Sequence, residues 1–157
     1  CASAGVMRSL AAFAGGLESL ASRAAEALAT ARTAGVDTIV DATPFDLGRD
    51  VELLADVSRR SGVTIIAETG HWLVPSVFML NRSTAELATM FTADLATGAD
   101  GTAIRCGVIK AASEEEITEF DRRVLEAAAI AHRETGAPII THAAARNRIG
   151  EAQAAVF

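Results

Sequence analysis

A lysine and a histidine stand at the expected carboxyl ends of two apolar stretches. Lys110 closes the run at 104–110, and His142 lies in "PIITHAA", which begins at Pro138. Burying a lysine is costly unless its charge is removed or used. Away from water, a lysine amine gives up its proton more readily, and the neutral amine forms a Schiff base with a carbonyl substrate. Lys110 is therefore a candidate nucleophile.

Metal binding is the second chemistry open to the same two residues. A neutral amine also captures carbon dioxide, and the carbamate that results is an anionic oxygen ligand. It would bridge two divalent ions, with the imidazole of His142 as a nitrogen ligand to one of them. Two metals would generate hydroxide at neutral pH and polarise the oxygen of a target. Sequence spacing alone leaves the Schiff base and the metal centre both open.

The elements that must position these residues alternate between helix and strand. Strands are expected to begin near residues 36, 63, 104 and 138, with helices over 16–35, 48–62 and 83–98 and a further helix ending at Gly136. This spacing is typical of βαβ units with a parallel sheet, in which the ligand site lies at the carboxyl ends of the strands. The absence of a GxGxxG motif and of a P-loop favours a barrel over a nucleotide-binding open sheet. The expected strand ends carry Asp41 and Thr43, Glu68 and Thr69, Lys110, and Thr141 and His142.

Two capping signals help to set the helix boundaries. Ser83 and Glu86 predict a capping box for helix 83–98. Ser113 and Glu116 predict a second one, which would place the acidic run 114–116 in the first turn of the following helix, where negative charge suits the helix dipole.

The stretch 71–81 is apolar, contains a proline and has no clean period. We expect it either to cap a hydrophobic substrate or to be buried in a dimer interface. Of the other polar residues near the strand ends, Asp41 and Glu68 are expected to orient metal ligands or to bond helix N-termini. No metal role is expected for His71.

The amino-acid composition limits the classes of protein to which this chain can belong. The 157 residues predict one domain, 1–157; half are hydrophobic and 22% are charged, which allows a packed core. The net charge of −6 and the scattered Lys and Arg exclude a nucleic-acid partner, and no apolar run reaches the length of a membrane span. Two cysteines, Cys1 and Cys106, form neither a disulfide framework nor a zinc motif, so a reduced, cytoplasmic setting is expected.

The sequence resembles the phosphotriesterase family of the amidohydrolase superfamily. "GVIKAAS", followed one helix later by "APIITHAAARNRIGEAQAAVF", is the specific part, and "AGVDTIVDATPFDLGRDVELLADVSRRSGVTIIAETGHW" and "LNRSTAELATMFTADLATG" fit as well. The resemblance implies an α/β fold, a partial (β/α)8 TIM barrel covering about strands two to five. It places the carboxylated, catalytic, metal-bridging lysine on Lys110. A second metal ligand falls on His142, and an aromatic wall of the substrate pocket falls on Trp72.

The activity implied by the resemblance is hydrolysis of lactones or organophosphate triesters by a metal-bound hydroxide. The cofactors would be two divalent ions, zinc or else cobalt, manganese or iron, together with the carbamate on Lys110. The "FMLNRS" loop resembles the lactonase branch more closely. The substrate would be a small hydrophobic ester, lactone or organophosphate, and the full-length protein is expected to allow a homodimer. A Schiff-base aldolase using Lys110 and a non-catalytic ligand-binding relative remain as alternatives.

The sequence also departs from the family pattern. The His-x-His pair of strand one, the histidine of strand six and the aspartate of strand eight have no counterpart among the 157 residues. A full barrel has roughly 250 residues. We therefore expect an internal segment of a longer metal-dependent hydrolase, without hydrolytic activity by itself.

Overall fold

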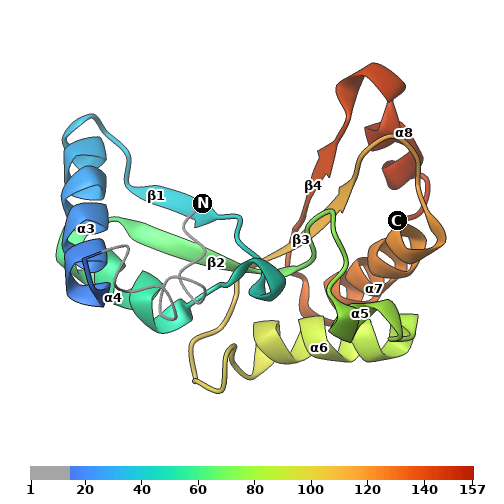
Figure 1. Cartoon of the computed structure of the whole chain (residues 1–157), viewed down its shortest axis with the longest axis horizontal. Helices are drawn as coiled ribbons and strands as arrows, with labels where there is room; N and C mark the ends of the chain where they lie inside the picture. Colours follow the sequence, from blue (N-terminus) through green and yellow to red (C-terminus); the bar gives the residue numbers. More distant parts are fainter. Residues whose placement is uncertain (1–14) are drawn as a thin grey trace.

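Four parallel strands alternate with helices in a computed structural model that describes residues 15–157. The strands are β1 (Thr38–Asp41), β2 (Thr64–Gly70), β3 (Val108–Ser113) and β4 (Ile139–Ala143). They lie in chain order in one sheet, and each neighbouring pair is parallel. Figure 1 shows the sheet curling into an open trough. This order, curl and alternation confirm the predicted fold class, a partial (β/α)8 barrel.

The helices lie where the periodic segments predicted them. They are α3 (Leu17–Thr33), α4 (Val51–Ser61), α6 (Thr84–Ala96) and α7 (Glu119–Thr135), with shorter helices α5 (Val77–Leu80) and α8 (Ile149–Ala154) and 3₁₀ turns η1 (Phe45–Leu47) and η2 (Ala145–Asn147). The capping box predicted for α6 is present, because Ser83 and Glu86 bond each other's backbone N–H groups. Within residues 15–157, no helix combines the length and the apolar character that crossing a membrane requires.

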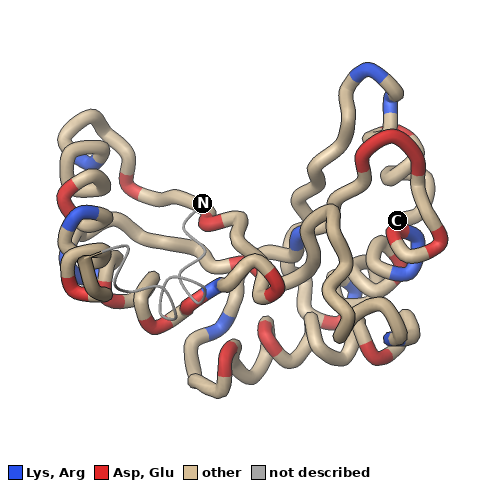
Figure 2. The backbone as a smooth tube through the Cα atoms, in the orientation of Figure 1, with Lys and Arg blue, Asp and Glu red and all other residues tan. Residues whose placement is uncertain are grey.

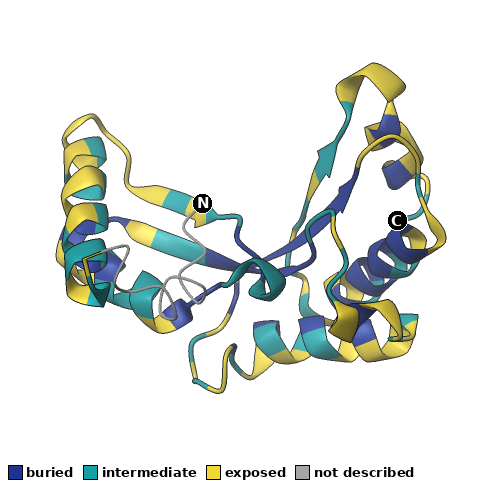
Figure 3. Ribbon diagram, in the orientation of Figure 1, coloured by how far each residue is buried: buried dark blue, intermediate teal, exposed yellow. Residues whose placement is uncertain are grey.

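The sheet has an outer face covered by helices and an inner face that follows the trough. Successive side chains of a strand point to opposite sides. Ile109 of β3 belongs to the core formed with α6 and α7, and Ile65 of β2 packs on the smaller core between α3 and α4. The alternate positions therefore form the inner face, and the pairing registers place Glu68, Lys110 and His142 on it. Figure 3 shows β3 buried along its whole length, whereas β1 at the sheet edge is partly exposed.

The predictions around the third strand are wrong in position. β3 begins at Val108 and continues past Lys110 to Ser113, so Lys110 lies inside the strand. Ser113 is paired with Ala143 of β4 and caps no helix. The acidic run 114–116 lies in the loop between β3 and α7, visible as the continuous acidic stretch of Figure 2. Sheet pairing fixed the backbone of Ser113 in an extended form, which overrode its local capping signal.

The true N-cap of α7 is five residues further along the chain. The hydroxyl of Thr118 accepts a hydrogen bond from the N–H of Asp121 at 3.1 Å, and the Asp121 carboxylate accepts one from the N–H of Thr118 at 3.0 Å. This reciprocal pair satisfies two N–H groups that a helix start otherwise leaves unpaired.

Thr118→Ala is expected to lower the free energy of unfolding of the whole protein by about 1 kcal/mol, because it removes a helix cap. Ser113→Ala is the matched control. The Ser113 hydroxyl is buried without a hydrogen-bond partner, so removing it should be neutral or stabilising. Denaturant unfolding monitored by circular dichroism measures both changes. A larger loss for Ser113→Ala than for Thr118→Ala would contradict the assignment.

Candidate active site

Lys110 is held on the inner face of the central strands. The residue is 7% exposed, and its backbone lies between Gly70 of β2 and Ile140 of β4. The carbonyl of Lys110 accepts a hydrogen bond from the N–H of His71 at 3.0 Å. Gly70 has a φ of +116°, and a Cβ at this position would overlap the backbone of Lys110. Only glycine permits so close an approach, and it fixes the base of the lysine side chain.

Trp72 brings the predicted site residues together. The Nζ atom of Lys110 lies 5.1 Å from the centroid of the indole, within the range of a cation–π contact. The imidazole of His142 lies 4.7 Å from the indole, centroid to centroid, with the ring planes inclined at 54°. Trp72 follows β2, Lys110 lies inside β3, and His142 is the second-last residue of β4. Lys110 and His142 thus share one apolar neighbour at the rim of the trough.

His142 is supported from α8 by Gln153, a residue that no motif in the sequence singled out. The side-chain amide of Gln153, which is 1% exposed, donates to the backbone carbonyl of His142 at 2.9 Å. This contact joins residues eleven apart, and it depends on how α8 folds back on β4. A lone glutamine in a short helix carries no sequence signal of such a role.

Glu68 lies deeper on the inner face than the predicted strand end. It occupies the third-last position of β2 and is fully buried. Neither carboxylate oxygen has a hydrogen-bond partner among the described residues. Burial raises the pKa of Glu68 to about 8, although the positive charge of Lys110 acts in the opposite direction. Asp41, which shared its predicted role, instead accepts a hydrogen bond from the N–H of Thr43 at 3.0 Å and closes a local turn.

A buried histidine–aspartate pair lies beside the end of β2. The Nδ1 atom of His71 is 2.6 Å from a carboxylate oxygen of Asp46, and both side chains are almost fully enclosed. The rings of His71 and Phe120 of α7 are nearly perpendicular, with 5.1 Å between their centroids. The pair joins the turn after β1 to the end of β2 and to α7. No metal role was expected for His71, and Asp46 carried no recognisable signal in the sequence.

The free thiol in the described residues is not a competing nucleophile. Cys106 lies before β3 and is buried, and this burial raises the pKa of its thiol to about 12. A thiol that stays protonated is a poor nucleophile and a poor metal ligand. Cys1 lies outside the described residues.

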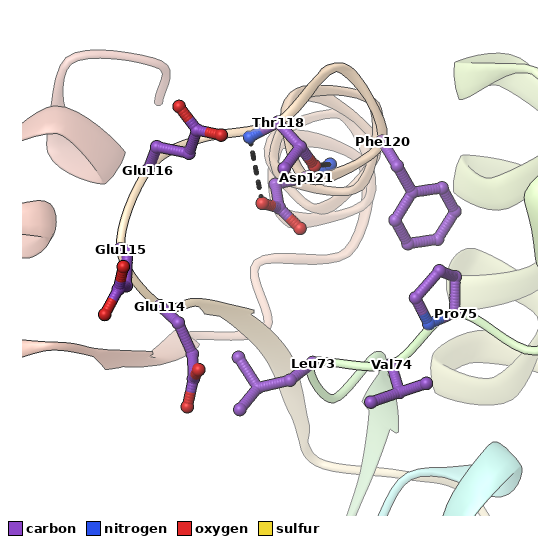
Figure 4. A pocket seen from close by; sticks show the side chains of 9 residues that line it. All are labelled: Leu73, Val74, Pro75, Glu114, Glu115, Glu116, Thr118, Phe120 and Asp121. Atoms are coloured by element: carbon purple, nitrogen blue, oxygen red, sulfur yellow. Dashed lines mark hydrogen bonds between the residues drawn. The ribbon is translucent and has the colours of Figure 1, made fainter.

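A pocket of about 520 Å³ opens at the same rim, between the loop after β2 and the loop after β3. Figure 4 shows an apolar side formed by the proline-containing loop and an acidic side formed by the loop before α7. One of the acidic residues, Glu115, is paired with Arg146 at 2.6 Å. The lining residues are Leu73, Val74, Pro75, Glu114, Glu115, Glu116, Thr118, Phe120 and Asp121.

The apolar stretch 71–81 divides between this pocket and the surface. Leu73 and Pro75 line the pocket, whereas Val77 and Phe78 of α5 are 82% and 50% exposed. The guanidinium of Arg82 lies over the ring of Phe78, 4.6 Å from its centroid. The first part of the stretch thus borders the pocket, whereas in the second part Val77 and Phe78 face outward and Met79 is buried in the core.

Fold and site together define a partial parallel barrel with a candidate catalytic centre on its inner face, at the carboxyl ends of the strands. The chain belongs to the phosphotriesterase family, whose model matches residues 16–157. This confirms the resemblance seen in the sequence.

Three curated relatives extend the comparison. The chain is 41% identical over 119 residues to the aryldialkylphosphatase of Saccharolobus solfataricus, covering 74% of this chain and 38% of that protein. It is 36% identical over 115 residues to the phosphotriesterase homology protein of Escherichia coli, covering 70% and 39%. It is 36% identical over 114 residues to the N-acetyltaurine hydrolase of Salmo salar, covering 71% and 33%. The chain therefore spans about two fifths or less of the length of these relatives.

Proposed function

We propose that the whole protein is a metal-dependent hydrolase that cleaves lactones or organophosphate triesters. The observation that carries this proposal is the buried position of Lys110 on the inner face, with His142 on the next strand and Trp72 in contact with both. Membership of the phosphotriesterase family supports it, as do relatives whose names describe hydrolases of phosphate esters and of an amide.

Lys110 and His142 fit as part of a metal-binding set. An imidazole nitrogen and a carbamate oxygen both suit zinc and the neighbouring divalent metals. Residues 15–157 contain no group of three or more His, Cys, Asp or Glu side chains that could hold a metal ion. In this proposal the carbamate of Lys110 therefore joins His142, and further ligands come from other strands of the barrel.

The chemistry divides between the metals and the chain. Two divalent ions supply an activated water and polarise the oxygen of the scissile bond. Lys110, as a carbamate, and His142 would hold them on the inner face of the sheet. The indole of Trp72 packs over both side chains, keeps water from that side and offers an apolar wall to the substrate. Gln153 fixes the backbone of His142 and with it the direction of the imidazole.

The pocket at the rim favours a neutral substrate. N-acetyltaurine carries a sulfonate, whereas lactones and phosphotriesters carry no charge. Glu114 and Glu116 line the pocket, so an anionic substrate would be repelled there, while Leu73 and Pro75 offer contact to an apolar chain. Lys110, His142 and Trp72 do not line this pocket, but a substrate that passes it to reach them would be a lactone or a triester rather than N-acetyltaurine.

The test is an assay of the purified whole protein with zinc or cobalt present. We expect hydrolysis of a lactone with an apolar chain or of an aryl dialkyl phosphate. The rate should fall to background after dialysis against a chelator and return when metal is added. Borohydride treatment in the presence of a carbonyl compound should leave Lys110 unmodified. Covalent trapping on Lys110, or a rate that does not depend on metal, would favour the Schiff-base aldolase instead.

A further inference from the structure

Glu68 is a buried carboxylate that the described residues leave without a partner. It is 0% exposed, and both of its oxygens lack hydrogen bonds. Burying a carboxyl group without a hydrogen-bond partner is costly whether the group is ionised or protonated, and buried carboxyl groups in proteins are therefore paired or bind metals. A residue kept at such a cost on the inner face of a barrel needs a ligand of its own.

The charged groups around Glu68 do not provide that partner. The guanidinium of Arg49 is bound to Asp94 and Asp100 and donates to the backbone carbonyl of Glu68, not to its carboxylate. Within residues 15–157 no ion pair joins Glu68 to Lys110, whose Nζ atom lies over the indole of Trp72 instead. The remaining charges that act on Glu68 are the carboxylates of Asp41 and Asp46, which repel it.

Position connects Glu68 to the metal site. It lies two residues before Gly70, and Gly70 is in register with Lys110 on the neighbouring strand, so the two side chains project from the same face. When the ammonium of Lys110 becomes a carbamate, it first loses one proton; the neutral nitrogen then bonds the carbon of carbon dioxide and releases a second proton to solvent. The cation beside Glu68 is then replaced by an anion. Two anions on one dry face require a cation to balance them.

We propose that Glu68 is a further metal ligand, which binds through its carboxylate beside the carboxylated Lys110. The inference rests on the proposed function, because that function brings the metals to this face. It adds a carboxylate from β2 to the lysine of β3 and the histidine of β4. Carboxylate oxygens bind zinc and the related divalent ions readily, so the donor type is suitable.

The test compares Glu68→Gln with the wild type in the whole protein. The amide keeps the shape of the side chain but removes its charge. We expect zinc to bind at least about tenfold more weakly in a chelator-competition titration, with less metal retained on purification. Glu26→Gln, an exposed glutamate on α3, is the matched control and should change neither quantity.

The outcomes separate this inference from the proposed function. If the wild type binds two metals and hydrolyses a lactone or triester, but Glu68→Gln binds zinc with wild-type affinity, then Glu68 is no ligand and the proposed function stands. A Glu68→Gln variant that is only less stable, with unchanged affinity, leads to the same conclusion. If the wild type binds no metal, both are wrong. Weaker zinc binding by Glu68→Gln, with the affinity of Glu26→Gln unchanged, supports the inference.

Discussion

Lys110→Ala should reduce hydrolysis by the whole protein by about three orders of magnitude. The lysine is expected to carry the carbamate that holds both metals. The metals stabilise the charge of the transition state by several kcal/mol. Each 1.4 kcal/mol lost from this stabilisation slows the reaction about tenfold. Lys110 is the single lysine of the 157 residues, so this segment offers one amine for carboxylation. Initial rates with a lactone and with an aryl dialkyl phosphate measure the effect.

Lys110→Arg is the decisive companion to that variant. Arginine keeps the positive charge and the contact with the face of Trp72, but it stays protonated and cannot form a carbamate. It should therefore be as inactive as Lys110→Ala. Carbon-13 NMR of protein equilibrated with labelled bicarbonate should show a carbamate carbon that both variants lack. An active Lys110→Arg enzyme would mean that the lysine serves as a cation, which would overturn its role as a metal bridge.

The architecture could be predicted because its signals are local. The β-branched runs, the glycines that end helices and the capping box of Ser83 and Glu86 each act within a few residues. Gly62, for example, adopts the left-handed conformation expected after α4. The order of the strands then follows from the length of the connections, since parallel neighbours need a crossover helix.

The end of β3 could not be predicted in the same way. Ser113 and Glu116 have the spacing of a capping box, and so do Thr118 and Asp121. The choice between them depends on whether β4 pairs with β3 as far as Ser113, a contact between segments about thirty residues apart. Where two local capping signals are equally strong, tertiary pairing decides between them. Here the pairing of β3 with β4 extends the strand to Ser113, so Lys110 lies in its interior and not at its end.

The residues of the candidate site also differ in how far the sequence alone could predict them. Lys110 and His142 were recognisable from residue type and place in the chain, and the structure brings them around Trp72. Glu68 was noticed as a polar strand end, but its importance lies in a property that no sequence displays: complete burial without a partner. The pair of Asp46 and His71 depends equally on two segments that meet only in the folded chain.

Arg49→Ala should be among the most destabilising substitutions in the described residues. The Arg49 side chain is 2% exposed and reaches from the start of α4 to carboxylates that follow β2 in the chain. It bonds Asp94 and Asp100, each at 2.7 Å, and the carbonyl of Glu68 at 2.8 Å. Truncation leaves these acceptors without their donor. Because Asp94 and Asp100 keep 20% and 30% exposure, we expect a loss of about 3 kcal/mol, the lower end of the range for broken buried pairs.

Arg59→Ala, a substitution within α4, provides the control. Its side chain is 70% exposed and pairs with Asp56 one turn away, so its loss should cost under about 0.5 kcal/mol. Arg49→Lys should fall between the two, because it keeps the charge without the fork that bonds several acceptors at once. Equal midpoints for Arg49→Ala and Arg59→Ala in urea unfolding would show that the network is not structural. A selective loss at Arg49 would mean that its bonds to Asp94, Asp100 and the carbonyl of Glu68 stabilise the fold, and that this guanidinium is engaged away from the Glu68 carboxylate.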